Sequence, residues 1–195
     1  MTGVPFSVCV YCGSRNGVRS AYRDLALRLG TAIGRRGWQL VYGGGRAGLM
    51  GAVADATLAA GGTVVGVIPE SLMNLEVGHA GLTELHVVQT MHQRKQLMAE
   101  RSHAFIAMPG GIGTFEELFE VWTWRHLAYH DRPIGLLDAE GYWAPMLQFL
   151  RHSVAEGFMG DDQMAMLHSD DQVERLLDTL ATRAGDPTDD NFSRI

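Results

Sequence analysis

The segment PGGIGTFEE, residues 109–117, decides how this chain is expected to fold. Before it, residues 104–108 form an apolar run typical of a buried strand. After it, residues 115–127 carry apolar side chains at the i, i+3, i+4, i+7 spacing of one helical face. A strand, a glycine turn and a helix in this order place free backbone N–H groups at the start of the helix. The segment therefore predicts a seat for a phosphate, with Thr114 expected at the helix cap.

The rest of the chain repeats this alternation of strand and helix. Continuous apolar strands that alternate with helices indicate an α/β fold, a Rossmann-like doubly wound parallel sheet with helices on both faces. Ligands bind such sheets beyond the carboxyl ends of the strands, where the glycine-rich turns of this chain are expected. Residues 1–183 are expected to form one nucleotide-binding domain, and residues 184–195, which lack periodicity, a disordered tail. Strands are expected at residues 6–11, 39–42, 63–68, 84–88, 104–108 and 133–137, and helices at 22–33, 49–60, 91–101, 115–127, 143–155 and 171–183.

The composition narrows the class of protein. Hydrophobic residues make up 46% of the 195 residues, so a sizeable core is available. The net charge of −6 argues against a nucleic acid or an anionic membrane surface as the main partner. Glycines and threonines interrupt the longest apolar region, residues 56–69, so no membrane span is expected. Because the first residues do not resemble a signal peptide, the expected location is the cytoplasm.

The two cysteines, Cys9 and Cys12, form a C-x-x-C pattern. A redox pair of this kind starts a helix, whereas Cys9 lies in an expected strand and Cys12 in the turn after it. A zinc site would need a second pair of ligands, and the chain has no other cysteine. Both thiols are therefore expected to be structural and reduced.

Two further glycine-rich turns are candidate binding elements. The first contains Ser14 and Arg15 and is as consistent with an ordinary connection as with a ligand contact. The second matches G-x-G-x-x-G at Gly43, Gly45 and Gly48, and Glu70 follows 27 residues after the first of these glycines. Because of this pattern, a nicotinamide-dinucleotide oxidoreductase stays open as an alternative function for the chain. Against it, the fingerprint follows the second expected strand, not the first.

The segment MHQRK, residues 91–95, adds positive charge at the same edge of the predicted sheet. Lys95 is the only lysine of the chain, and Arg94 precedes it. Cations at a helix start oppose the helix dipole, which favours a ligand contact over a merely solvated turn. Glu117 is expected one turn into the phosphate-binding helix. A carboxylate beside an anion seat suggests catalysis on a small phosphorylated molecule.

The segments at 109–117 and 91–95 match two motifs, P-G-G-x-G-T-x-x-E and M-H-x-R-K. The Lonely Guy family of cytokinin riboside 5′-monophosphate phosphoribohydrolases has both motifs in this order and spacing, so the chain resembles that family. The likeness extends from about residue 6 to about residue 183 and includes the glycine loop at 43–51. It implies hydrolysis of the N-glycosidic bond of N6-modified adenosine 5′-monophosphates, which releases the free base and ribose 5-phosphate. It also implies a homodimer with sites near the interface.

The resemblance implies a role for each matching residue. Arg94 and Glu117 fall on the catalytic positions, and no metal or cofactor is required. The expected phosphate-binding and other substrate-binding residues are Gly110, Gly111, Ile112, Gly113, Thr114, Glu76, Arg94, Lys95, Glu116, Glu117 and Thr123.

Several alternatives stay open on the sequence alone. Glu116 and Glu120 are other carboxylates that could serve the chemistry, although their spacing of four favours a solvated helical face. His126 and His130 share the same spacing without a third metal ligand and are expected at a helix surface or end. A pyridoxal-phosphate decarboxylase could form its Schiff base only on Lys95. A non-catalytic nucleotide-binding protein would use the same phosphate seat without turnover.

Overall fold

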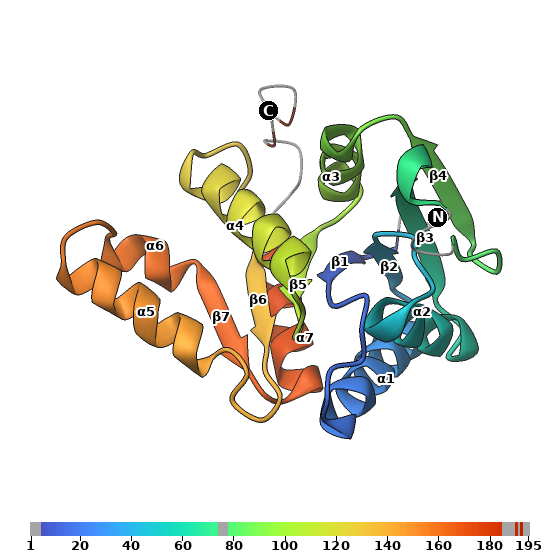
Figure 1. Cartoon of the computed structure of the whole chain (residues 1–195), viewed down its shortest axis with the longest axis horizontal. Helices are drawn as coiled ribbons and strands as arrows, with labels where there is room; N and C mark the ends of the chain where they lie inside the picture. The colour runs from blue at the N-terminus through green and yellow to red at the C-terminus, as the bar shows by residue number, and fades with distance from the viewer. Residues whose placement is uncertain (1–4, 74–77, 185–189, 191, 193–195) are drawn as a thin grey trace.

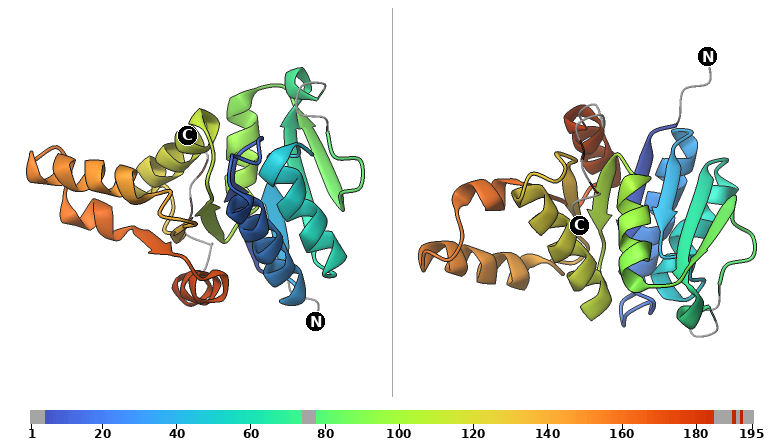
Figure 2. Two further views of the ribbon diagram at one scale, coloured as in Figure 1. Left: turned by 60° about the horizontal axis from the view of Figure 1, so that its bottom comes forward. Right: turned by 90° about the horizontal axis from the view of Figure 1, so that it is seen from above.

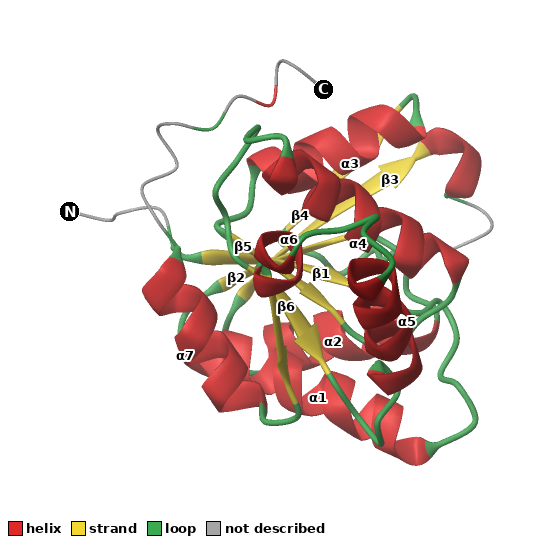
Figure 3. Cartoon of the chain, turned by 90° about the vertical axis from the view of Figure 1, so that its left-hand side faces the viewer, coloured by secondary structure: helices red, strands yellow, loops and turns green. Residues whose placement is uncertain are grey.

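A computed structural model describes residues 5–73, 78–184, 190 and 192 of the chain. It contains a seven-stranded sheet in the order β4-β3-β2-β1-β5-β6-β7, with parallel pairing throughout (Figures 1 and 3). The strands are β1 Ser7–Tyr11, β2 Gln39–Tyr42, β3 Thr63–Pro69, β4 Glu84–Val88, β5 Ala104–Ala107, β6 Ile134–Leu137 and β7 Leu167–Asp170. The helices are α1 Ser20–Arg35, α2 Gly48–Ala59, α3 Met91–Glu100, α4 Ile112–His126, α5 Ala144–Ala155, α6 Asp161–Ala165 and α7 Val173–Arg183, with a 3₁₀ turn at Glu70–Leu72.

The helices cover both faces of the sheet (Figure 2). Alternate side chains of β1 separate the two cores: Val8 and Val10 pack in a cluster with α1, α2 and α7, and Cys9 and Tyr11 pack in a cluster with α3, α4 and α5. Burial on both faces explains why the central strands read as continuous apolar runs. The expected Rossmann-like α/β fold is confirmed.

Helices α1 and α2 approach each other closely. Leu25, Leu29 and Ile33 form the buried stripe of α1 that the sequence predicts. Between them lies Gly30, where a Cβ atom would be 2.3 Å from the carbonyl oxygen of Val53 on α2. A larger residue at position 30 would therefore force the two helices apart.

Two elements were not expected from the sequence. β7 has the sequence LHSD and pairs with β6 alone, so as an edge strand it carries few apolar side chains. α6 has only five residues, too few to show a helical period. The six expected strands and six expected helices are all present, with ends shifted by a few residues.

The order of the strands determines where a ligand can bind. From β1 the chain passes to β2, β3 and β4 on one side, then returns through α3 to β5 on the other side of β1. The connections that leave β1 and β5 therefore diverge. The resulting crevice lies at the carboxyl ends of these two strands, the usual ligand position in doubly wound sheets.

Both cysteines are buried and free, on opposite sides of the sheet. Burial raises the pKa of each thiol, and the charge of Glu117 raises both further. They stay protonated at neutral pH, as expected for structural residues. Among the described residues, no helix is long and apolar enough to cross a membrane.

His130 lies in the connection between α4 and β6, with 4% of its surface exposed. Its Nε2 is 2.9 Å from the carbonyl oxygen of Val121, and its Nδ1 accepts a hydrogen bond from the backbone N–H of Arg132 at 3.1 Å. These partners fit a neutral ring that donates from Nε2. Burial, assisted by the positive charge of Arg132, lowers the pKa of His130 to about 4.

We expect His130 to make folding sensitive to acid. As the pH falls below 6.5, the unfolded chain binds a proton at this residue, whereas the folded chain does not until about pH 4. The free energy of unfolding should therefore decrease across this window, by up to about 3 kcal/mol from this group. Urea unfolding of His130→Gln from pH 7 to 4.5 should show a flatter pH dependence than wild type. His126→Gln, at the exposed end of α4, is the control, and equal slopes in all three proteins would contradict this assignment.

Candidate active site

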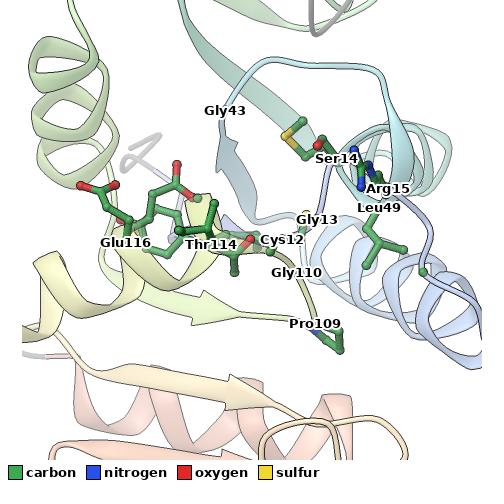
Figure 4. Close-up of a pocket in the computed structure, with 18 of the residues that line it drawn as sticks. Cys12, Gly13, Ser14, Arg15, Gly43, Leu49, Pro109, Gly110, Thr114 and Glu116 are labelled. Carbon is green, nitrogen blue, oxygen red and sulfur yellow. The ribbon is translucent and has the colours of Figure 1, made fainter. Parts of the chain in front are cut away.

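A pocket of about 580 Å³ lies at the carboxyl edge of the sheet, in the crevice between β1 and β5. Its volume is in the range of small-molecule sites. Thr114 and Glu116 of α4 lie on one side of it, and Ser14, Arg15 and Leu49 on the other, with the turn at Pro109 and Gly110 between them (Figure 4). The remaining lining residues are Val10, Tyr11, Cys12, Gly13, Asn16, Gly17, Tyr22, Gly43, Met50, Leu72, Met91, Arg94, Gly111, Ile112, Gly113, Glu117 and Tyr142.

The turn before α4 presents backbone N–H groups to the pocket. The helix begins at Ile112, with Gly111 as its cap residue, and its first backbone hydrogen bond runs from Phe115 N–H to the Gly111 carbonyl at 3.1 Å. The N–H groups of residues 112–114 therefore precede the hydrogen-bond ladder. A Cβ atom added to Gly111 or Gly113 would meet nothing within 4 Å, so a ligand can approach the backbone there.

Thr114 is not the cap that the sequence predicts, because the helix starts before it. It is the third residue of α4, and its side chain is buried against Gly110. A Cβ atom at Gly110 would lie 2.1 Å from the Thr114 hydroxyl oxygen. Glycine at position 110 is thus required by this contact within the turn, whereas the glycines at 111 and 113 leave space for a ligand.

Two contacts from outside the turn hold it in place. The backbone N–H of Gly13, directly after β1, donates to the carbonyl oxygen of Pro109 at 3.1 Å. The Tyr142 hydroxyl, from the connection between β6 and α5, donates to the carbonyl oxygen of Gly110. Sequence reasoning missed Tyr142, because it belongs to no glycine motif and its contact spans 32 positions of the chain.

Arg94 extends from the first turns of α3 to the glycine after β2 and lines the pocket. Only 4% of its surface is exposed, and its Nη2 donates to the carbonyl oxygen of Gly43 at 3.0 Å. A Cβ atom at Gly43 would lie 2.0 Å from Nη2. The glycine after β2 thus provides the space in which the guanidinium lies. Burial and this hydrogen bond hold the side chain against the turn after β2.

Glu117 is half-buried in the pocket, one turn beyond the start of α4. Burial raises the pKa of Tyr11 at the end of β1, and the negative charge of Glu117 raises it further. Cys12 beside it also has a raised pKa, from burial first and Glu117 second. These neighbouring groups stay neutral at pH 7, so the negative charge at this end of β1 belongs to Glu117.

Lys95 connects α3 to α4 beside the pocket. Its Nζ lies 2.5 Å from a carboxylate oxygen of Glu116 and 2.9 Å from one of Glu120. The lysine side chain is only 12% exposed, and the two carboxylates raise its pKa. The spacing of Glu116 and Glu120 predicted that both carboxylates face solvent, but in the structure both form ion pairs with the one lysine of the chain. A Schiff base on Lys95 would break both ion pairs.

The other predicted site residues lie apart from the pocket or cannot be placed. Thr123 is exposed two turns farther along α4, and its hydroxyl donates to the carbonyl oxygen of Phe119 at 2.7 Å. Glu76 lies outside the described residues. Arg94, Gly110, Gly111, Ile112, Gly113, Thr114, Glu116 and Glu117 all line the pocket.

The second glycine loop lines the pocket through Gly43, Leu49 and Met50, but the backbone at the start of α2 packs against protein. The N–H of Leu49, in the first turn of α2, donates to the carbonyl oxygen of Gly13 at 3.0 Å. Gly48 has φ +61°, and a Cβ atom there would lie 2.4 Å from the carbonyl carbon of Ser14. The start of α2 is therefore covered by the loop after β1. This packing accounts for Gly48, and the Arg94 side chain accounts for Gly43, without a pyrophosphate.

Comparisons with known proteins identify the family of this chain. The family described as "Possible lysine decarboxylase" matches residues 50–180. A cytokinin riboside 5′-monophosphate phosphoribohydrolase of Rhodococcoides fascians is 55% identical over 156 residues, which cover 80% of this chain and 79% of the relative. The chain belongs to the Lonely Guy family.

Other Lonely Guy proteins are nearly as similar. The cytokinin riboside 5′-monophosphate phosphoribohydrolase LOG1 of Arabidopsis thaliana is 45% identical over 173 residues, covering 89% of this chain and 81% of the relative. Among solved structures, the molybdenum cofactor binding protein of Rippkaea orientalis superposes with a TM-score of 0.69 over 93% of this chain and 98% of its own. Its sequence identity is 17%, so this likeness shows the fold alone.

The contact between Arg94 and Gly43 leads to a prediction for this Lonely Guy protein. We expect Gly43→Ala to displace the guanidinium and to reduce ligand affinity or turnover at least about tenfold, with the fold retained. Isothermal titration with adenosine 5′-monophosphate and a melting curve separate the two effects. Gly61→Ala is the control, because Gly61 has φ +88° with nothing within 4 Å and lies between α2 and β3. It should lose stability and keep the site; a Gly43→Ala protein with an unchanged site would contradict the assigned role.

Proposed function

We propose that this chain hydrolyses the N-glycosidic bond of N6-modified adenosine 5′-monophosphates to the free base and ribose 5-phosphate. The observation that carries the proposal is the presence of three groups in one pocket: the N–H groups at the start of α4, the carboxylate of Glu117 and the guanidinium of Arg94. The phosphoribohydrolases at 45–55% identity support the same activity.

The start of α4 suits the 5′-phosphate. The N–H groups of Gly113 and Thr114 and the positive end of the helix dipole all favour an anion at this position. One helical turn of about 5.4 Å separates Gly113 from Glu117. A phosphate held at the helix start therefore brings the ribose alongside the Glu117 carboxylate.

The bond between C1′ and the base nitrogen breaks through a state in which positive charge develops on the ribose and negative charge on the base. Glu117 stabilises the positive charge and orients a water molecule, whose oxygen forms the new bond to C1′. The base leaves with the bonding electron pair and takes up one proton. One proton of the water stays on the new C1′ hydroxyl and the other is released, so the protons balance. Arg94, always charged, stabilises the developing negative charge.

The proposed phosphate seat predicts that adenosine 5′-monophosphate is hydrolysed and adenosine is not. Without the phosphate, the ribose has no anchor that holds it against Glu117, so kcat as well as affinity should fall. Release of base and of ribose 5-phosphate, measured at matched concentrations, checks this. Gly113→Val, which leaves the surrounding protein undisturbed but crowds the seat, should lower the rate on the monophosphate. Comparable rates on both substrates would mean that the turn is only structural.

The role of Glu117 predicts that Glu117→Gln folds normally and binds the monophosphate, while kcat falls about 10²–10⁴-fold. The amide keeps the shape of the side chain and loses its charge. Single-turnover hydrolysis and equilibrium binding measure the two effects separately. Glu100→Gln, at the exposed end of α3, should behave as wild type. A Glu117→Gln rate near that of wild type would remove Glu117 from the mechanism.

We further propose that two copies of the chain associate through α4. Ile112 is 86% exposed and Phe119 38% exposed, and their spacing of seven places both on one face of the helix. Thr123 shares this face, so a second copy packed there would cover a residue that the family resemblance assigns to the ligand. Because Ile112 also lines the pocket, the interface would adjoin the site.

Light scattering at micromolar concentration should therefore give twice the chain mass of 21.3 kDa. Phe119→Glu places a charge in the proposed interface and should shift the protein toward the monomer. Phe158→Glu is the control, because Phe158 is also exposed but lies in the connection between α5 and α6. A monomeric wild type, or equal dissociation by both variants, would contradict an interface on α4.

A further inference from the structure

Two residues near the C-terminus, Asp190 and Phe192, pack into the protein although the sequence places them in a tail. Phe192 is 6% exposed. Its ring lies edge-on to Trp124 of α4, with centroids 6.4 Å apart, and stacks on His130 at 5.7 Å. It belongs to the core cluster between the sheet and helices α3, α4 and α5. An isolated aromatic residue has no periodicity, so its burial gives no signal in the sequence.

Arg132, just before β6, connects this segment to α3. Its Nε lies 2.5 Å from a carboxylate oxygen of Asp190, and both side chains are about nine-tenths buried. Its guanidinium also lies over the Phe192 ring, 4.7 Å from the centroid. On the other side, Nη1 donates to the carbonyl oxygens of Ala99 and Ser102 at the end of α3. One guanidinium thus joins the tail to α3.

The tail also contacts α3 directly. The side-chain amide of Gln96 donates to the carbonyl oxygen of Phe192 at 3.5 Å. Phe192 therefore contacts both helices, α3 through Gln96 and α4 through Trp124. The same two helices carry Arg94 and Glu117, and beside the pocket Lys95 joins them through Glu116 and Glu120.

We propose that Asp190 and Phe192 are positioning residues, which hold α3 and α4 at the separation that places Arg94 against Glu117 for catalysis. The Lys95 ion pairs join the helices near the site, and the C-terminal contacts join them farther from it. Loss of Phe192 would leave a void between the helices, and the surrounding residues would move to fill it. Because Gln96 is only two residues from Arg94, a shift of α3 reaches the site directly. The kinetic consequence rests on the proposed hydrolysis.

This role differs from general stabilisation in its kinetic signature. The proposed phosphate seat is built from α4 and the turns after β1 and β5, so it does not depend on α3. Displacement of α3 should therefore lower kcat more than it raises KM. A small misplacement of a catalytic group costs about 10- to 100-fold in rate. A residue that contributes only to stability would change neither constant in the folded protein.

The experiment compares full-length Phe192→Ala with Leu180→Ala, which removes an equally buried side chain on the opposite face of the sheet. We expect Phe192→Ala to lose about tenfold or more in kcat, with KM within about threefold of wild type, while Leu180→Ala keeps both constants. Phe192→Tyr should restore the rate, because its ring can still lie over Arg132. Asp190→Asn, a smaller change, should give an intermediate loss.

Hydrogen exchange of the α3 amides provides a readout that does not depend on turnover. Exchange should be faster in Phe192→Ala than in wild type and unchanged in Leu180→Ala. Unchanged kcat and α3 exchange in Phe192→Ala, or equal losses in the two alanine variants, would overturn the positioning role. If wild type hydrolyses no nucleotide, the proposed function fails, and the exchange of α3 still decides whether the tail positions this helix.

Discussion

The parallel pairing of β1 with β5 is the constraint on which the site depends. It aligns Tyr11 with Ala107 at the carboxyl ends of the two strands, although they are far apart in the chain. The turns that follow then meet, and the N–H of Gly13 donates to the carbonyl oxygen of Pro109. Without this register, the turn after β1 would not lie opposite the start of α4. The N-terminus of α4 would then be open to solvent and would not line a pocket.

Burial at this edge determines which groups carry charge. Cys9, Tyr11 and Cys12 are enclosed by the sheet and its helices, and burial raises the pKa of each. A neutral surrounding of low polarity strengthens the effect of the charges that remain. In the proposed mechanism, Glu117 therefore acts beside neutral groups that do not offset its charge.

The sequence predicts the parts of the protein that depend on local pattern. The six apolar strands, the stripe of α1 and the glycine turn before α4 all follow from the spacing of side chains over a few residues. Contacts between distant residues are a different matter. Nothing near Gly43 indicates that it lies under Arg94, and nothing near Tyr142 indicates its bond to the turn at Gly110. The edge strand β7 was missed because its position relaxes the need for apolar residues. The helix cap was misplaced because α4 begins within the glycine turn, with Gly111 as its cap residue.

The glycines of the turn before α4 divide into two kinds. Gly110 is required by the Thr114 side chain, whereas Gly111 and Gly113 have free space where a side chain would be. Selection for foldability alone would leave these last two positions free to vary. Packing among the described residues thus does not require glycine at these two positions, whereas the proposed phosphate seat does. Libraries randomised at positions 111 and 113 would consequently change which anion the turn accepts while the fold stays intact. A screen based on melting temperature would not detect these variants, because their stability would be unchanged.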